Sequence, residues 1–305
     1  MLDSTVFGGT GVALVTPFNK DYSIDYGAYG NIIEHVIAGG VNFLVPLGST
    51  GETATLNEEE SRDILDFVIE VNQGRLPIVA GNFGGNNTLE LCRKIKDYNF
   101  NGVDAILSSS PAYVKPNQEG IYQHYMEMEK VSSVPIIIYN VPGRTKSNIE
   151  WNTTVRLANS SSKFIAIKEA TGDLIQATRI LKNKPKNFLL LSGDDEVTLP
   201  MVASGGDGVI SVMANAYPDL FSRVTKNALE GDLVAAREYN LLTYDLHKWL
   251  YIEGNPVGIK AAMQHLGLCG NQVRLPLHTM NPTNESNLIQ CMEEITLITS
   301  KHSIA

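Results

Sequence analysis

The sequence predicts an α/β fold, a (β/α)8 TIM barrel, with a C-terminal helical appendage. Short apolar runs alternate with amphipathic segments at a spacing of about 20–35 residues, which is typical of βα units in a parallel sheet. Eight such units in about 230 residues fit a closed barrel better than an open sheet. Each run is followed by Gly, Ser, Thr or Pro. The predicted strands are 12–15, 43–47, 77–80, 103–107, 135–139, 164–167, 188–191 and 208–211.

The segments between these runs have the apolar spacing of helices that bury one face. They include 26–38, 57–71, 89–98, 118–131 and 174–181. From about residue 230 only helical patterns occur, at 234–246, 257–266 and 286–299. We therefore divide the chain into a barrel with the active site at 1–229 and a C-terminal helical region at 230–305. No low-complexity linker separates the two parts, so we expect them to pack tightly together.

The composition limits the classes of function. The chain has 305 residues, of which 43% are hydrophobic, and this is enough for one barrel-sized core. Its net charge of −9 argues against binding to nucleic acid or to an anionic membrane. No apolar stretch approaches the roughly 18 residues of a membrane span, and residues 1–6 lack the features of a signal peptide. We expect a cytoplasmic protein whose three scattered cysteines (Cys92, Cys269 and Cys291) are reduced.

Lys168 is the residue most informative about chemistry. It closes the apolar run 164–167 and is followed by Glu-Ala-Thr-Gly, which predicts a buried strand and then a turn into a helix. Desolvation at the end of such a strand disfavours the ammonium form and frees the lone pair that a Schiff base requires. The alternative is a lysine whose ammonium extends from the strand end into solvent.

In a barrel of this kind the chemistry belongs at the carboxyl ends of the strands. Polar segments follow four of the predicted strands, at 48–52, 108–113, 139–145 and 192–195, and we expect them to surround one mouth. The turn Gly-Ser-Thr-Gly at 48–51 offers hydroxyls and backbone amides that can hold a carboxylate or a phosphate. Its alternative is an ordinary turn with a helix cap.

Two further side chains are candidates at this mouth. Tyr139 ends a run of isoleucines, so its phenol can move protons within an apolar wall; the alternative is a core tyrosine. Arg144 follows a Pro-Gly turn that would direct its guanidinium over the mouth, where it could clasp a carboxylate. Its alternative is a surface arginine.

The sequence predicts neither a cofactor nor a metal. The glycines at 81–85 do not match a dinucleotide-binding fingerprint, and the six histidines are dispersed without metal-ligand spacing. Asp194 and Asp195 follow a strand, and we interpret this pair as a helix N-cap rather than as metal ligands.

Taken together, the motifs at 48–52 and 139–142 and Lys168 resemble the family of pyruvate-dependent class I aldolases that includes dihydrodipicolinate synthases and N-acetylneuraminate lyases. The resemblance extends from residue 11 to residue 277. Arg144, the Ser-Gly-Asp-Asp run at 192–195 and the Asn-Pro pair before Lys260 are similar to the synthase branch. The lyases generally lack an arginine at this position, because their second substrate is a sugar.

Membership of the synthase branch implies a condensation of pyruvate with aspartate 4-semialdehyde on the way to lysine and diaminopimelate. It also implies a homotetramer built as a dimer of tight dimers, in which a tyrosine crosses the tight interface. The resemblance assigns catalysis to Lys168, Tyr139, Ser49 and Tyr113, and substrate binding to Thr50, Arg144, Gly193 and Ile210.

The sequence departs from the pattern of this family at several positions. Ser49 stands where threonine is usual; it keeps the hydroxyl but lacks the methyl group that fixes the rotamer. Ala112 replaces a tyrosine of the lysine-inhibition site, and Glu58 and Ser61 stand where inhibited enzymes often have histidine. We therefore expect lysine to inhibit weakly or not at all. The alternatives are an N-acetylneuraminate or 2-keto-3-deoxy sugar-acid aldolase, and a barrel that binds a small carboxylate without catalysis.

Overall fold

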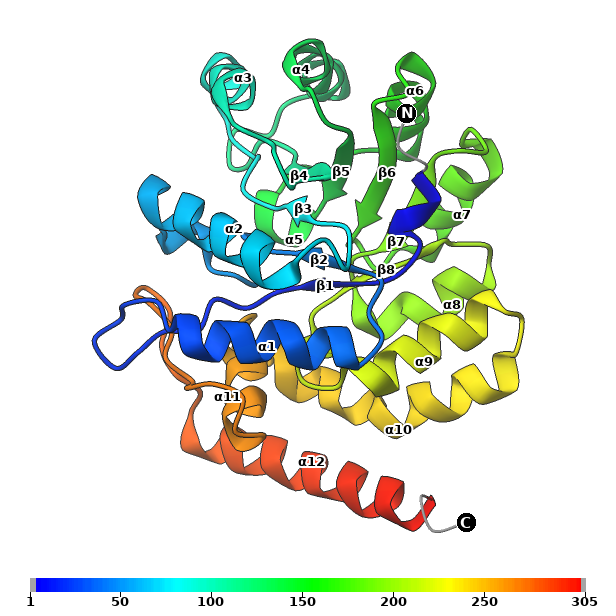
Figure 1. The fold of residues 1–305 in the computed structure, drawn as a ribbon. Helices are drawn as coiled ribbons and strands as arrows, with labels where there is room; N and C mark the ends of the chain where they lie inside the picture. Colours follow the sequence, from blue (N-terminus) through cyan, green and yellow to red (C-terminus); the bar gives the residue numbers. More distant parts are fainter. Residues whose placement is uncertain (1–3, 303–305) are drawn as a thin grey trace.

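The computed structural model describes residues 4–302 and forms a barrel of eight parallel strands (Figure 1). Neighbouring strands pair in the order β2-β1-β8-β7-β6-β5-β4-β3, and a parallel bridge between Leu44 and Ile78 brings β2 next to β3. The predicted barrel is therefore confirmed. The strands are β1 (Gly9–Ala13), β2 (Phe43–Val45), β3 (Val79–Ala80), β4 (Ala105–Ser109), β5 (Ile136–Asn140), β6 (Phe164–Glu169), β7 (Leu189–Ser192) and β8 (Gly208–Ser211).

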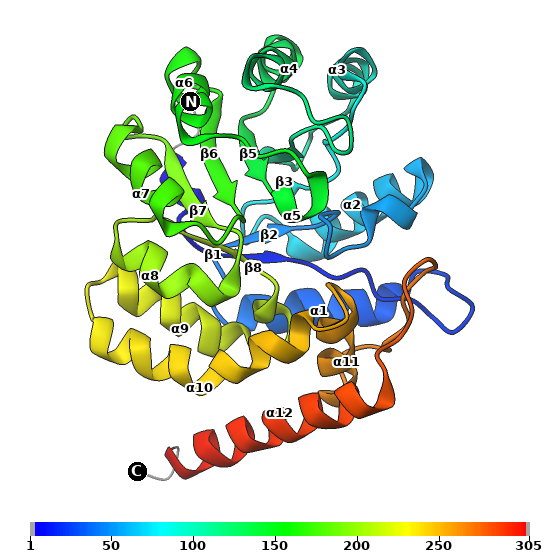
Figure 2. The same ribbon diagram turned by 180° about the vertical axis from the view of Figure 1, so that it is seen from behind.

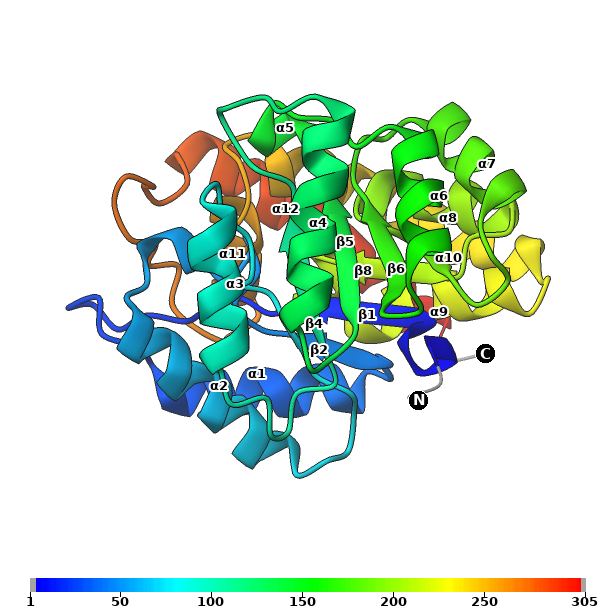
Figure 3. The ribbon, with the colours of Figure 1, turned by 90° about the horizontal axis from the view of Figure 1, so that it is seen from above.

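Helices surround the strands, as the view from above shows (Figure 3). Many of them begin at an Asn or Asp whose side chain accepts a backbone N–H of the first turn; Asn57 and Glu60 form a complete capping box at α2. The helices around the barrel are α1 (Tyr26–Ala38), α2 (Glu58–Asn72), α3 (Thr88–Asp97), α4 (Gln118–Val131), α5 (Pro142–Thr145), α6 (Trp151–Ser160), α7 (Leu174–Asn183), α8 (Thr198–Ala203) and α9 (Pro218–Leu229).

The apolar core has two layers, because the strands are buried on both faces. One cluster fills the barrel, with Phe7 and Phe43 in edge-to-face contact. The other lies between the strands and the surrounding helices. Gly11 is required by the inner layer, because a Cβ atom there would lie 2.2 Å from the ring of Phe43. The first strand accordingly begins before the predicted 12–15, where glycines carry no apolar signal.

The C-terminal region is helical, with α10 (Leu233–Tyr251), α11 (Val257–His265) and α12 (Pro282–His302). Figures 1 and 2 both place α12 on the side of the molecule opposite α3 and α4. The turn at 230–232 falls at the boundary that the sequence predicts, while the division into two domains remains a prediction.

No helix among residues 4–302 is both long and apolar enough to cross a membrane. Residues 1–3, which begin the segment without signal-peptide features, lie outside the described residues, as do residues 303–305 at the end of the predicted helical region.

Candidate active site

Lys168 lies near the carboxyl end of β6 with only 5% of its surface exposed. Its side chain lines a cavity of about 360 Å³ at the mouth of the barrel. Within residues 4–302 its Nζ atom forms no hydrogen bond or ion pair, and it lies 4.6 Å from the centroid of the Tyr139 ring. The amine therefore points into the cavity rather than into solvent, and no carboxylate of the described chain pairs with it.

Tyr139 lies beside Lys168 because β5 and β6 are paired in register at these two residues. It is buried within the inner apolar cluster and lines the same cavity. A phenol next to a buried amine in an apolar wall is suited to exchange protons with groups bound there.

Gly193 follows β7 and provides the space that the lysine side chain occupies. A Cβ atom at this position would lie 2.7 Å from Cβ of Ala170, 2.9 Å from Cγ of Lys168 and 3.1 Å from its Cε. The absence of a side chain at Gly193 thus sets the path of the Lys168 side chain across the cavity wall.

The turn after β2 brings Ser49 and Thr50 to the cavity. The turn is closed by hydrogen bonds from the Gly51 and Glu52 amides to the Gly48 and Ser49 carbonyls, at 3.0 and 3.2 Å. In the described part of the chain the Ser49 and Thr50 amides donate no hydrogen bond. Two amides and two hydroxyls are therefore available to a carboxylate, which favours the anion cradle over an ordinary turn.

Arg144 lies in the short helix α5 and lines the cavity beside Asn255. Its NH2 group donates to the Asn255 carbonyl oxygen at 3.0 Å. The Asn255 side chain in turn donates through Nδ2 to the hydroxyl oxygen of Thr50 at 2.9 Å, which leaves the Thr50 hydroxyl proton free to donate. One residue of the C-terminal region thus contacts both expected carboxylate-binding residues.

Further cavity residues were not identified as site residues from the sequence. Asp194 and Glu196 follow β7, where the rule that strand ends carry chemistry could have found Glu196. Tyr251 comes from the end of α10, and nothing in the sequence indicates that this residue reaches the cavity. Asp194 accepts the Glu196 N–H at 3.1 Å, so its predicted capping role is confirmed. Burial, reinforced by the charges of Asp195 and Glu196, raises the pKa of the Asp194 carboxyl.

Glu169, the residue after Lys168, is fully buried and links β6 to its neighbours. It accepts hydrogen bonds from the Asn140 side chain, the Gln176 side chain and the Thr171 amide, each at 2.9 Å. Burial raises the pKa of this carboxyl, although the donors oppose the shift. The network ties the ends of β5 and β6 to α7 and so supports the pairing of Tyr139 with Lys168.

Two of the predicted site residues lie outside the cavity. Tyr113 is 89% exposed and has a left-handed backbone with φ of 69°, so its ring projects from the surface of this chain. Ile210 is buried in β8 opposite Gly11, and Val212, two residues further along the chain, lines the cavity instead. The other six predicted residues line one cavity: Lys168, Tyr139, Ser49, Thr50, Arg144 and Gly193.

The cavity can therefore hold a small molecule that carries carboxylates and a carbonyl group. The Lys168 amine and the Tyr139 phenol line it, the turn at Ser49 and Thr50 can bind one anion, and Arg144 can bind another. Within residues 4–302 no group of three or more His, Cys, Asp or Glu side chains could hold a metal ion.

The sequence of this chain is similar to those of known proteins over most of its length. The model of the dihydrodipicolinate synthetase family matches residues 6–295. The chain is 46% identical over 275 residues to the 4-hydroxy-tetrahydrodipicolinate synthase of Flavobacterium psychrophilum, which covers 90% of this chain and 94% of the relative. It is also 46% identical over 269 residues to the synthase of Parabacteroides distasonis, with 88% and 90% covered.

Solved structures agree with the sequence relatives. The dihydrodipicolinate synthase of Aquifex aeolicus superposes with a TM-score of 0.91 at 39% identity, covering 95% of this chain and 99% of that one. The synthase of Thermotoga maritima gives a TM-score of 0.93 at 34% identity, with 96% of this chain and 99% of that one covered.

Proposed function

Because the chain belongs to the dihydrodipicolinate synthetase family, we propose that this cavity condenses pyruvate with aspartate 4-semialdehyde through a Schiff base on Lys168. The chain has the activity of a 4-hydroxy-tetrahydrodipicolinate synthase, a class I lyase of lysine and diaminopimelate biosynthesis. The observation that carries the residue assignment is the buried, uncommitted Lys168 amine 4.6 Å from the Tyr139 ring.

The first half of the reaction activates pyruvate. The Lys168 amine attacks the ketone carbon, water leaves, and a protonated imine forms. The hydroxyl of Thr50 and the amides of the turn hold the pyruvate carboxylate. Loss of a proton from the methyl group then gives an enamine, with the iminium nitrogen as the electron sink.

The second half builds the ring. The enamine carbon attacks the aldehyde of aspartate 4-semialdehyde, whose carboxylate pairs with Arg144, and the aldehyde oxygen gains a proton. The substrate amine then adds to the imine carbon and displaces the Lys168 amine, which closes a six-membered ring and frees the enzyme. One water is released for each pair of substrates.

Tyr139 donates and accepts the protons of these steps, with Ser49 and Tyr113 as relay groups. Because Tyr113 is 89% exposed on its own chain, we propose that it enters the site of a second copy. Gly193 completes the pocket through its backbone, and Val212 rather than Ile210 lines it on the side of β8. We further propose a cytoplasmic homotetramer built as a dimer of tight dimers; one structural relative at a TM-score of 0.93 is described as a monomeric variant. Light scattering of the wild type and of Tyr113→Phe, with activity measured in parallel, tests the assembly and the relay separately.

Borohydride trapping tests the central proposal. Reduction in the presence of pyruvate should add the mass of one reduced pyruvyl group per chain to the wild type and none to Lys168→Ala. Turnover should be rapid with aspartate 4-semialdehyde and negligible with N-acetylmannosamine. A trapped adduct in Lys168→Ala, or full synthase activity in that variant, would overturn the assignment of the nucleophile.

A further inference from the structure

A fully buried ion pair joins the pyruvate-binding turn to the C-terminal region. Glu52 ends the turn and Lys260 lies in α11; neither side chain is exposed, and Nζ of Lys260 lies 2.5 Å from Oε1 of Glu52. The pair lies outside the set of residues that line the active-site cavity.

The surroundings of the pair compensate for its burial. Lys260 also donates to the Gln272 carbonyl oxygen at 2.8 Å, and its Nζ lies 4.2 Å from the centroid of the Phe18 ring. The second carboxylate oxygen of Glu52 accepts the Arg274 backbone amide at 2.9 Å. A buried ion pair costs desolvation and often contributes little net stability compared with an apolar pair. Stability alone is therefore a weak reason for this arrangement.

The turn that Glu52 ends has a strained backbone at this residue. Glu52 has a left-handed backbone with φ of 55°, a conformation that costs a non-glycine residue about 1 kcal/mol or more. In this conformation its amide donates to the Ser49 carbonyl oxygen at 3.2 Å, and Thr16 donates through its hydroxyl to the Gly51 carbonyl oxygen at 2.7 Å. The ion pair holds the residue that carries this strain.

We propose that Glu52 and Lys260 are positioning residues that fix the Ser49–Thr50 turn in the conformation that binds the pyruvate carboxylate. The inference rests on the proposed role of that turn and extends it to residues outside the cavity. The C-terminal region then acts on catalysis through two contacts with the turn: the Lys260 pair at its end and the Asn255 side chain on Thr50.

Variants of the ion pair should weaken pyruvate binding to an extent that their loss of thermal stability does not explain. Glu52→Gln and Lys260→Met each remove one charge, and Glu52→Asp keeps the charge but withdraws it by one methylene. Because small displacements of binding groups cost about 10-fold or more, each variant should need roughly 10-fold more pyruvate for half-maximal borohydride trapping. The KM for aspartate 4-semialdehyde should stay within about twofold, because the Arg144 guanidinium donates to the Asn255 carbonyl oxygen and bonds to neither member of the ion pair.

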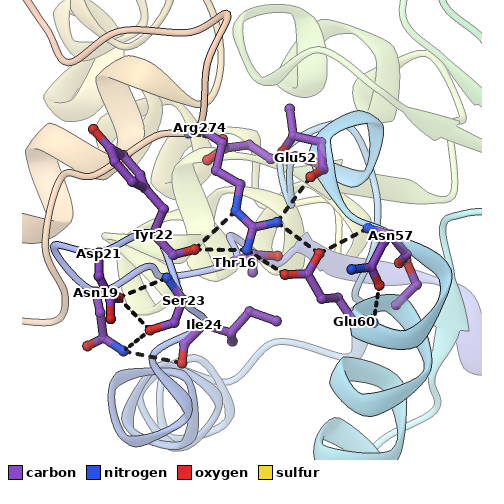
Figure 4. A network of polar contacts seen from close by, with 12 residues as sticks. Thr16, Asn19, Asp21, Tyr22, Ser23, Ile24, Glu52, Asn57, Glu60 and Arg274 are labelled. Atoms are coloured by element: carbon purple, nitrogen blue, oxygen red, sulfur yellow. Dashed lines mark hydrogen bonds and ion pairs between the residues drawn. The ribbon is translucent and has the colours of Figure 1, made fainter.

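A matched control lies in the same network (Figure 4). Glu60 binds the Arg274 guanidinium and so joins the same two parts of the chain without touching the turn. Glu60→Gln should lower the melting temperature but leave pyruvate trapping within about twofold of the wild type. The double variant Glu52→Gln/Lys260→Met should regain thermal stability relative to Lys260→Met and keep the weak pyruvate binding, because no unpaired buried charge remains.

Wild-type pyruvate affinity in folded Glu52→Gln, Glu52→Asp and Lys260→Met would overturn the inference, and so would an equal loss in Glu60→Gln. Thr50→Val distinguishes this failure from failure of the proposed function. If Thr50→Val weakens trapping while the Glu52 variants do not, only the positioning role is lost. If Thr50→Val also binds pyruvate normally, the turn does not hold the carboxylate.

Discussion

Replacing Gly193 with alanine should slow imine formation without changing the chemistry of any catalytic group. The added Cβ atom would lie 2.9 Å from Cγ of Lys168 and 2.7 Å from Cβ of Ala170, about half an ångström or more inside the 3.4 Å at which ordinary contact begins. Overpacking of this kind costs about 1–3 kcal/mol. The clash with Cγ is relieved when the Lys168 side chain moves away from its present path along the cavity wall, and the clash with Ala170 requires a shift of the backbone.

If that cost falls on the attack of the amine, the rate of imine formation decreases by roughly 10- to 100-fold, because about 1.4 kcal/mol corresponds to a factor of ten. The assay is a quenched-flow borohydride trap with saturating pyruvate, read by intact mass. Gly85→Ala is the control, since a Cβ atom at Gly85, beyond the end of β3, meets nothing within 4 Å. A trapping rate within twofold of the wild type in Gly193→Ala would refute the argument that this glycine sets the lysine position.

Three other outcomes follow from the same structure. Arg144→Gln should raise the KM for aspartate 4-semialdehyde roughly 10- to 100-fold, which corresponds to the free energy lost with a hydrogen bond to a charged group, while pyruvate trapping stays normal. A change in pyruvate affinity with no change in this KM would contradict the assignment. Lysine should inhibit weakly or not at all, given Ala112, Glu58 and Ser61, and half-inhibition at sub-millimolar lysine in a steady-state assay would prove this wrong. Burial lowers the pKa of His124 from 6.5 to about 4. Between these two pH values the unfolded chain binds a proton at this histidine and the folded chain does not, so the free energy of unfolding decreases as the pH drops from 6.5 towards 4. This group should remove about 2 kcal/mol of unfolding free energy between pH 7 and pH 5, and urea titrations of His124→Gln should show a correspondingly smaller loss.

Periodicity was sufficient to predict the barrel and most of its helices. The predicted bounds of α1 and α4 agree with the structure, and each helix begins directly after a residue whose side chain caps it, Asp25 and Asn117. The start of β1 could not be predicted, since Gly9, Thr10 and Gly11 carry no apolar signal and only Gly11 packs against the ring of Phe43. The helix α6 was not identified because its β-branched residues favour helices weakly, so that packing rather than propensity forms it.

The site was predictable where a strand end dictates position. That rule brought Lys168, Tyr139, Thr50 and Arg144 to one cavity, because parallel strands of a barrel all end at the same face. It could not find Tyr251, which reaches the cavity through the packing of α10 on the barrel. Such packing depends on complementary side-chain shapes from distant parts of the chain, and a single sequence does not display them.

The contact between the turn and the C-terminal region also bears on how the protein is made. A ribosome adds roughly 5–20 residues per second, so every strand of the barrel, with Lys168 and Tyr139, is synthesised before Asn255 and Lys260. Until α11 emerges, the nascent barrel contains Lys168 but lacks two contacts of the Ser49–Thr50 turn. Under the proposed mechanism we therefore expect translation that stops short of Asn255 to yield a chain that has the proposed nucleophile but binds pyruvate weakly.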